Sequence, residues 1–164
     1  MAGGEFCMNA SRCAVYEYLK NSNKEKVEFS VSGTNKKLVG RKLSDNEIEI
    51  KFDIDKNIDD LIEVKNDFTC IKFDGILIAI LDENKSQKYI QKLKENEETV
   101  KNQLKEIMIT QIKSKEKAIG IILLERALEK IKINPIVWVK DIDRVFYETA
   151  CGCGSLGTAI YIYL

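Results

Sequence analysis

Residues 147–163, YETACGCGSLGTAIYIY, place Cys151 in a glycine-rich turn ahead of a small, apolar run of helical length. Near the N-terminus, residues 3–20, GGEFCMNASRCAVYEYLK, repeat this order, with a Gly-rich approach, Cys7 and then an amphipathic run. Each cysteine is therefore expected at the start of a helix, and the two stand near opposite ends of the chain. This arrangement predicts a two-lobed site to which each lobe contributes one thiol.

The chemistry expected of these thiols follows from their place at a helix start. Free backbone N–H groups and the positive end of the helix dipole stabilise anions, and they can lower a thiol pKa to about 3.5–7.5. The same N–H groups can hold a ligand carboxylate. Two such cysteines facing one carbon would make a two-base racemase. The plainer interpretation is that Cys7 and Cys151 are small apolar residues at tight turns.

The two motifs resemble those of a known family. Residues 5–13, EFCMNASRC, are similar to the first active-site motif of the diaminopimelate epimerase superfamily, and residues 148–155, ETACGCGS, are similar to its second. The interval between the cysteines also agrees with that family, and residues 1–12, MAGGEFCMNASR, are closest to its histidine racemase branch. The resemblance implies a cofactor-independent amino acid racemase or epimerase. The substrate that the resemblance suggests is histidine. The alternatives are a diaminopimelate epimerase and a truncated, non-catalytic remnant of the same fold.

The resemblance also implies a fold and a division of the chain. The expected fold is α/β (α+β), with two pseudo-symmetric lobes, each a curved, mostly antiparallel sheet around a central helix. Residues 1–57 would form part of the N-terminal lobe and residues 58–164 most of the C-terminal lobe. The family is longer at both ends, so the chain is expected to be a fragment.

The resemblance implies roles for individual residues. Cys7 and Cys151 would be catalytic, and the amide of Asn9 would hold the substrate or cap the helix. The residues expected to bind substrate are Met8, Asn9, Gly152, Cys153 and Arg144.

Several positions depart from the family pattern. Met8 replaces a glycine, Cys153 replaces the usual Thr or Ser, and Asp143–Arg144 is at best a remnant of a Glu-Arg pair. Because the positions that hold the second centre of diaminopimelate are replaced, another amino acid is favoured as substrate.

Composition excludes several classes of function. The 26 basic and 26 acidic residues cancel, which removes the basic excess typical of proteins that bind nucleic acid or an anionic membrane. The chain has no histidine, so Ser-His-Asp and Cys-His catalysis and His-bearing metal sites are excluded. The apolar runs 76–81 and 119–124 are shorter than the ~20 residues of a membrane span. The N-terminal residues show neither the basic nor the apolar region of a secretory signal, so none is expected.

Five cysteines without a scaffold-like spacing indicate free thiols in a reducing cytoplasm. Cys7, Cys13, Cys151 and Cys153 could instead form a zinc site, although C-x5-C and C-x-C are poor matches to zinc spacing. Cys13 is expected in the core, and Cys70 in an apolar strand. The expected partner is a small amino acid substrate, with neither cofactor nor metal, and the protein is compatible with a homodimer.

Hydrophobic periodicity predicts the remaining elements. A helix capped by Asn9 or Ser11 should run to about Lys20, and a charged boundary is expected at residues 55–60. A second, long helix is expected from about Ser86 to Met108. Strands are expected at 27–33, 38–43, 47–54, 68–73, 75–81, 118–125 and 134–142, with Pro135 at the start of the last, and the final residues should be helical.

Overall fold

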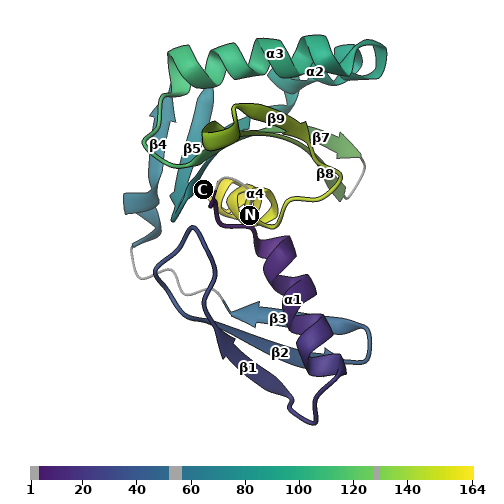
Figure 1. Ribbon diagram of the computed structural model, residues 1–164. Helices are drawn as coiled ribbons and strands as arrows, with labels where there is room; N and C mark the ends of the chain where they lie inside the picture. Colours follow the sequence, from purple (N-terminus) through teal and green to yellow (C-terminus); the bar gives the residue numbers. More distant parts are fainter. Residues whose placement is uncertain (1–3, 52–56, 128–129) are drawn as a thin grey trace.

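The computed structural model describes residues 4–51, 57–127 and 130–164. Within these ranges the fold is mixed α/β, as predicted, with one three-stranded and one six-stranded sheet (Figure 1). In chain order the elements are α1 (Met8–Lys20), β1 (Lys26–Phe29), β2 (Leu38–Ser44), β3 (Glu47–Lys51), η1 (Ile58–Leu61), β4 (Ile62–Lys65), β5 (Phe68–Phe73), β6 (Ile76–Leu81), α2 (Glu83–Glu95), α3 (Glu97–Ile107), η2 (Met108–Ile112), β7 (Ala118–Ala127), β8 (Lys130–Val139), η3 (Lys140–Ile142), β9 (Arg144–Tyr147) and α4 (Gly152–Tyr163).

The small sheet is antiparallel in the order β1-β2-β3, and α1 packs across it. The helix buries Ser11, Val15 and Leu19, which recur every four residues and so share one face. Gly40 in β2 makes room for this contact, because a Cβ there would lie 2.5 Å from a methyl carbon of Val15. The small sheet thus fixes the direction of α1.

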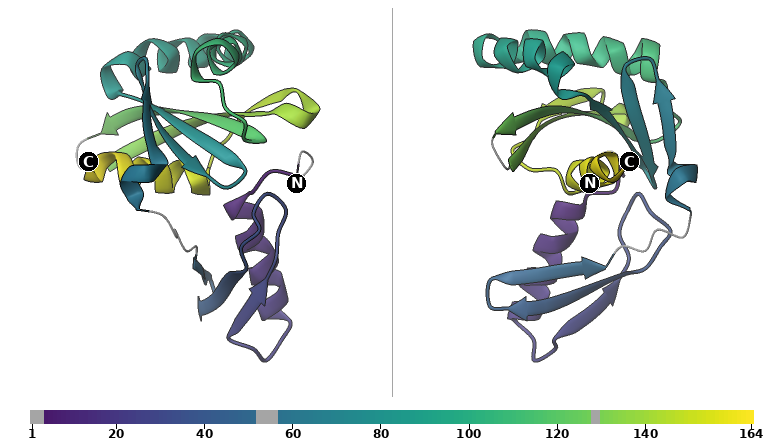
Figure 2. Two further views of the ribbon diagram at one scale, coloured as in Figure 1. Left: turned by 90° about the vertical axis from the view of Figure 1, so that its left-hand side faces the viewer. Right: turned by 180° about the vertical axis from the view of Figure 1, so that it is seen from behind.

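The large sheet has the order β4-β5-β6-β7-β8-β9, with antiparallel neighbours except for the parallel pair β6 and β7. Helix α4 lies in its concave face, while α2 and α3 cover the opposite face (Figures 1 and 2). The sheet is therefore apolar on both sides and forms the centre of the molecule.

Strand β6 is the clearest case of this double burial, and every one of its six side chains is buried. Ile76, Ile78 and Ile80 belong to the apolar cluster on the α4 side. The alternate residues Leu77 and Leu81 belong to the cluster on the α2–α3 side. An apolar run without alternation is the pattern of a strand covered on both faces, and the strand predicted at residues 75–81 is confirmed.

The prediction of one long helix from Ser86 to Met108 is wrong, because the helix is interrupted at Asn96. Asn96 is extended, with φ −154° and ψ 92°, and its side-chain oxygen accepts a hydrogen bond from the Thr99 N–H at 3.0 Å. Its own N–H still donates to the Lys92 carbonyl at 2.8 Å. One residue thus ends α2 and caps α3, while the apolar spacing continues across the break.

Three further expectations about the strands change. Pro135 lies inside β8 rather than at its start, and its carbonyl accepts from the Glu148 N–H at 3.0 Å. In an antiparallel strand the N–H and C=O of one residue point to the same side, so the missing N–H of Pro135 falls where β9 has ended. Strands β4 and β9 were not predicted. Residues 52–56, which include the end of the strand expected at 47–54, lie outside the described ranges.

Two glycines join the small sheet to the approach to Cys7. Gly33 has φ +85°, and a Cβ there would lie 2.0 Å from the backbone nitrogen of Phe6. Gly75 has φ +76°, and a Cβ there would lie 2.5 Å from the Gly33 carbonyl oxygen. Only glycine adopts this backbone region without strain and allows so close an approach. The loop after β1 is thereby pressed against the segment that leads into α1.

No helix within the described residues has both the length and the apolar character needed to cross a membrane.

Candidate active site

Cys7 and Cys151 are each the N-cap residue of a helix, and their local geometries are nearly identical. Cys7 has φ −132° and ψ 107°, and Cys151 has φ −137° and ψ 111°. The Cys7 sulfur accepts from the Ala10 N–H at 3.5 Å, and the Cys151 sulfur accepts from the Gly154 N–H at 3.4 Å. The expected position at a helix start is confirmed for both, and Cys7 takes the capping role that had been assigned to Asn9 or Ser11.

A serine four residues after each cysteine completes the repeat. The Ser11 hydroxyl donates to the Cys7 carbonyl at 2.9 Å, and the Ser155 hydroxyl donates to the Cys151 carbonyl at 2.9 Å. Sequence analysis missed these serines, although the spacing Cys-x3-Ser occurs in both motifs. Because the hydrogen bonds fix both cap carbonyls, the two helices begin with the same turn.

The two motifs meet directly. The Asn9 side-chain amide donates to the Ala150 carbonyl at 2.9 Å. Gly152 faces Met8 so closely that a Cβ at Gly152 would lie 2.7 Å from the Met8 Cβ. Met8, which stands where the resembled family has a glycine, therefore forms the contact that brings α1 to α4.

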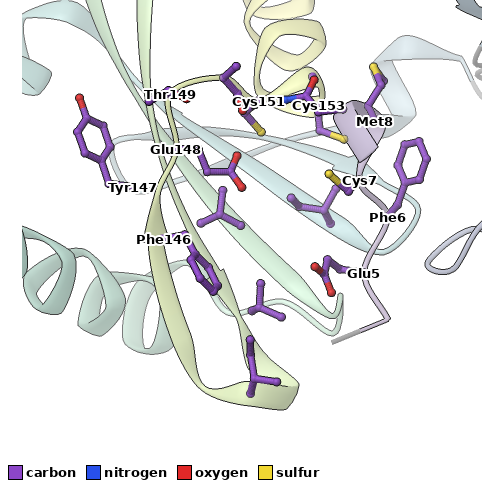
Figure 3. Close-up of a pocket in the computed structure, with 17 residues that line it drawn as sticks. Glu5, Phe6, Cys7, Met8, Phe146, Tyr147, Glu148, Thr149, Cys151 and Cys153 are labelled. Carbon is purple, nitrogen blue, oxygen red and sulfur yellow. Dashed lines mark hydrogen bonds between the residues drawn. The ribbon is translucent and has the colours of Figure 1, made fainter. Parts of the chain in front are cut away.

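Both cysteines line one cavity of about 460 Å³. Figure 3 shows their side chains with those of Glu5, Glu148 and Phe146 around this space. The lining residues come from the approach to α1, from β6, β8 and β9, and from the turn before α4: Glu5, Phe6, Cys7, Met8, Asn9, Ile76, Val137, Val139, Ile142, Phe146, Tyr147, Glu148, Thr149, Ala150, Cys151, Gly152 and Cys153.

Two lining carboxylates were not expected. Glu5 is buried, with 6% of its surface exposed, and Glu148 is half-buried. The Glu148 carboxylate lies beside the Cys151 thiol (Figure 3), and each group affects the pKa of the other. A signal was available in the sequence, since each carboxylate stands two or three residues ahead of a cysteine in its motif.

The lowered thiol pKa expected from the helix N-terminus is wrong for Cys151. Burial raises the pKa of the Cys151 thiol strongly, and the charge of Glu148 adds to this, while the Gly154 N–H opposes it. Burial likewise raises the pKa of the Cys153 thiol to about 12, opposed by a hydrogen bond from the Met8 N–H. Removal from water disfavours the thiolate more than one backbone donor stabilises it.

The pKa of Glu148 is also raised. Burial is the main cause, the hydrogen bond with Cys151 opposes it, and the charge of Glu5 adds to it. The Cys151 thiol therefore stabilises the Glu148 carboxylate, and the charge of that carboxylate disfavours the Cys151 thiolate.

The structure brings together most of the residues predicted to bind substrate. Met8, Asn9, Gly152 and Cys153 line the cavity, whereas Arg144 is exposed on β9 and is not among the lining residues.

Neither of the other two cysteines, Cys13 and Cys70, is among the residues that line this cavity. Cys13 is exposed, which corrects its expected place in the core, and Cys70 is buried as predicted. The four-thiolate zinc site is not formed, since no group of three or more His, Cys, Asp or Glu residues within the described ranges is placed to hold a metal ion.

The family model described as histidine racemase CntK N-terminal domain matches residues 1–164. A comparison with curated proteins finds no match.

Proposed function

The chain belongs to the histidine racemase CntK N-terminal domain family, and we propose that it is an amino acid racemase that uses Cys7 and Cys151 as its two bases. In this proposal the α-proton moves between thiols without pyridoxal phosphate or metal. Histidine is the substrate that the family's description suggests.

One observation carries the proposal. Two cysteines from opposite ends of the chain cap two helices in the same way and line the same cavity. Racemisation needs a base on one face of the α-carbon and an acid on the other. A pair of thiols supplied by two different helices meets this need, whereas two small residues at unrelated turns would have no reason to converge.

These residues can carry out both proton transfers that the reaction needs. The thiolate of one cysteine takes the α-proton, the electron pair left on the carbon is delocalised into the carboxylate, and the thiol of the other cysteine returns a proton on the opposite face. Backbone N–H groups at the two helix starts stabilise the charge on the carboxylate. When Cys151 must act as the base, Glu148 is the group that accepts its thiol proton.

The finer assignments are part of the same proposal. Asn9, Gly152 and Cys153 would hold the backbone of the substrate, and Met8 would close one side of the cavity. Arg144 would have no part in binding. The two sheets would correspond to the two lobes of the diaminopimelate epimerase superfamily, with residues 1–57 in the first lobe and 58–164 in the second.

The test is exchange of the α-proton with solvent. The protein is incubated in deuterated buffer with L- and D-histidine and then with other amino acids, and deuterium at the α-carbon is measured by mass spectrometry. Exchange should persist after treatment with a metal chelator and with a carbonyl reagent that destroys pyridoxal phosphate. Exchange with no amino acid would favour the interpretation as a non-catalytic remnant.

A further inference from the structure

We propose that Glu5 makes this cavity selective for amino acids whose side chain carries a positive charge, an inference that rests on the racemase function proposed above. Glu5 stands in the segment that leads into Cys7, and it is buried while lining the cavity. Its place beside Cys7, with the carboxylate directed into the cavity, puts Glu5 within reach of a bound molecule.

The charge of the cavity supports a cationic ligand. The charge of Glu5 helps to raise the pKa of Glu148, so the two carboxylates act on each other within one small space. No lysine or arginine is among the residues described as lining the cavity. A cation placed between the carboxylates would relieve their repulsion, while an anionic side chain would increase it.

The two carboxylates lie in different parts of the cavity. Glu148 lies beside the Cys151 thiol, so it adjoins the carbon that reacts and suits the α-ammonium group. Figure 3 shows Glu5 beyond Cys7 and away from Cys151, with its carboxylate directed into the cavity. A substrate whose α-carbon lies between the thiols would direct its side chain toward Glu5.

The walls of the cavity suit the stem of a long or aromatic cationic side chain. Ile76, Val137, Val139 and Ile142 contribute aliphatic surface to the cavity, and Phe146 contributes an aromatic ring. Aliphatic walls accept a methylene stem or an imidazole edge, and an aromatic face attracts a cation. The site therefore recognises a positive charge at the end of an apolar stem.

The experiment compares ligands that differ in charge and little in shape. Isothermal calorimetry with the whole chain measures dissociation constants for arginine against citrulline and for ornithine against norvaline. The unmodified protein should bind the cationic member of at least one pair about tenfold more tightly or better, the scale of a hydrogen bond to a charged group. Glu5→Gln should reduce this preference to about twofold or less and leave binding of the neutral member unchanged.

A matched control is Glu106→Gln, which removes an exposed carboxylate from α3 on the far side of the large sheet, and it should keep the preference. Equal weakening of both members of a pair in Glu5→Gln would assign Glu5 a structural role and overturn the proposal. The absence of a charge preference in the unmodified protein would overturn it even if Glu5→Gln failed to fold. Binding needs no turnover, so charge-selective binding without α-proton exchange would refute the racemase and leave the selectivity standing.

Discussion

Gly152→Ala tests whether the contact between the two helix starts aligns the thiols. The new Cβ would lie 2.7 Å from the Met8 Cβ and 3.0 Å from its sulfur. Two Cβ atoms are fixed by their backbones, so reaching an ordinary contact of about 3.5–4.0 Å requires α1 and α4 to separate by about 1 Å. A misplacement of about 1 Å can cost about 100-fold in rate. Overpacking should lower the free energy of unfolding by about 1–3 kcal/mol.

Gly157→Ala is the matched control, because it adds the same methyl group to the same helix without touching the site. Its Cβ would lie 2.9 Å from the Ile78 Cγ2, and overpacking there is partly offset by about 1 kcal/mol of helix propensity gained in mid-helix. The rate of α-deuterium exchange and urea unfolding are measured for both variants. Only Gly152→Ala should lose exchange beyond its loss of stability. Full exchange in Gly152→Ala, or equal losses in the two variants, would refute the argument.

Replacing either Cys7 or Cys151 by serine should abolish racemisation, because a hydroxyl is too weak an acid to form the base near neutral pH. Cys13→Ser at an exposed position should leave racemisation intact, and full turnover in both site variants would exclude the two-thiol mechanism. Glu148→Gln should slow exchange and flatten its pH profile, since the pKa of Glu148 is raised and its base form is lost as pH falls through that value. Burial raises the pKa of Cys70 from 9.0 to about 11, so the folded state holds this proton more tightly than the unfolded state. The contribution of the Cys70 thiol to stability should be fully present below pH 9.0 and be lost as pH rises from there to about 11. Urea titrations should therefore show a smaller fall in the free energy of unfolding over this pH interval for Cys70→Ala than for the unmodified protein.

The fold could be predicted wherever one strong pattern decided it. The unbroken apolar run of β6 required a strand covered on both faces, and the two Cys motifs marked helix starts. The break at Asn96 could not be predicted in the same way, because the apolar spacing continues through it. Whether one helix or two helices form depends on the Asn96 cap, which is worth about 1 kcal/mol. Tertiary packing can outweigh an energy of this size.

Cys13 shows an error that the sequence could have prevented. Successive residues of a helix are about 100° apart, so a residue two positions from Val15 points about 200° away from it. Val15 and Leu19 face the small sheet and are buried, and Cys13 is exposed on the opposite side. The two carboxylates of the cavity were missed for a different reason, since their burial depends on how segments from both ends of the chain meet.

Cys151 shows how two opposing effects on one thiol are resolved. The helix N-terminus stabilises a thiolate, and the Gly154 N–H does so here, but burial and the charge of Glu148 outweigh it and raise the pKa of the thiol. The group is therefore a proton donor at rest. The raised pKa of Glu148 offsets part of the rise in the thiol pKa, so transfer of the proton to this carboxylate costs less than transfer to a carboxylate with an ordinary pKa. Under the two-thiol mechanism, a substrate whose α-hydrogen faces Cys7 meets its proton donor already in place. The opposite enantiomer first requires the Cys151 proton to move to Glu148, so loss of this carboxylate should slow that direction more.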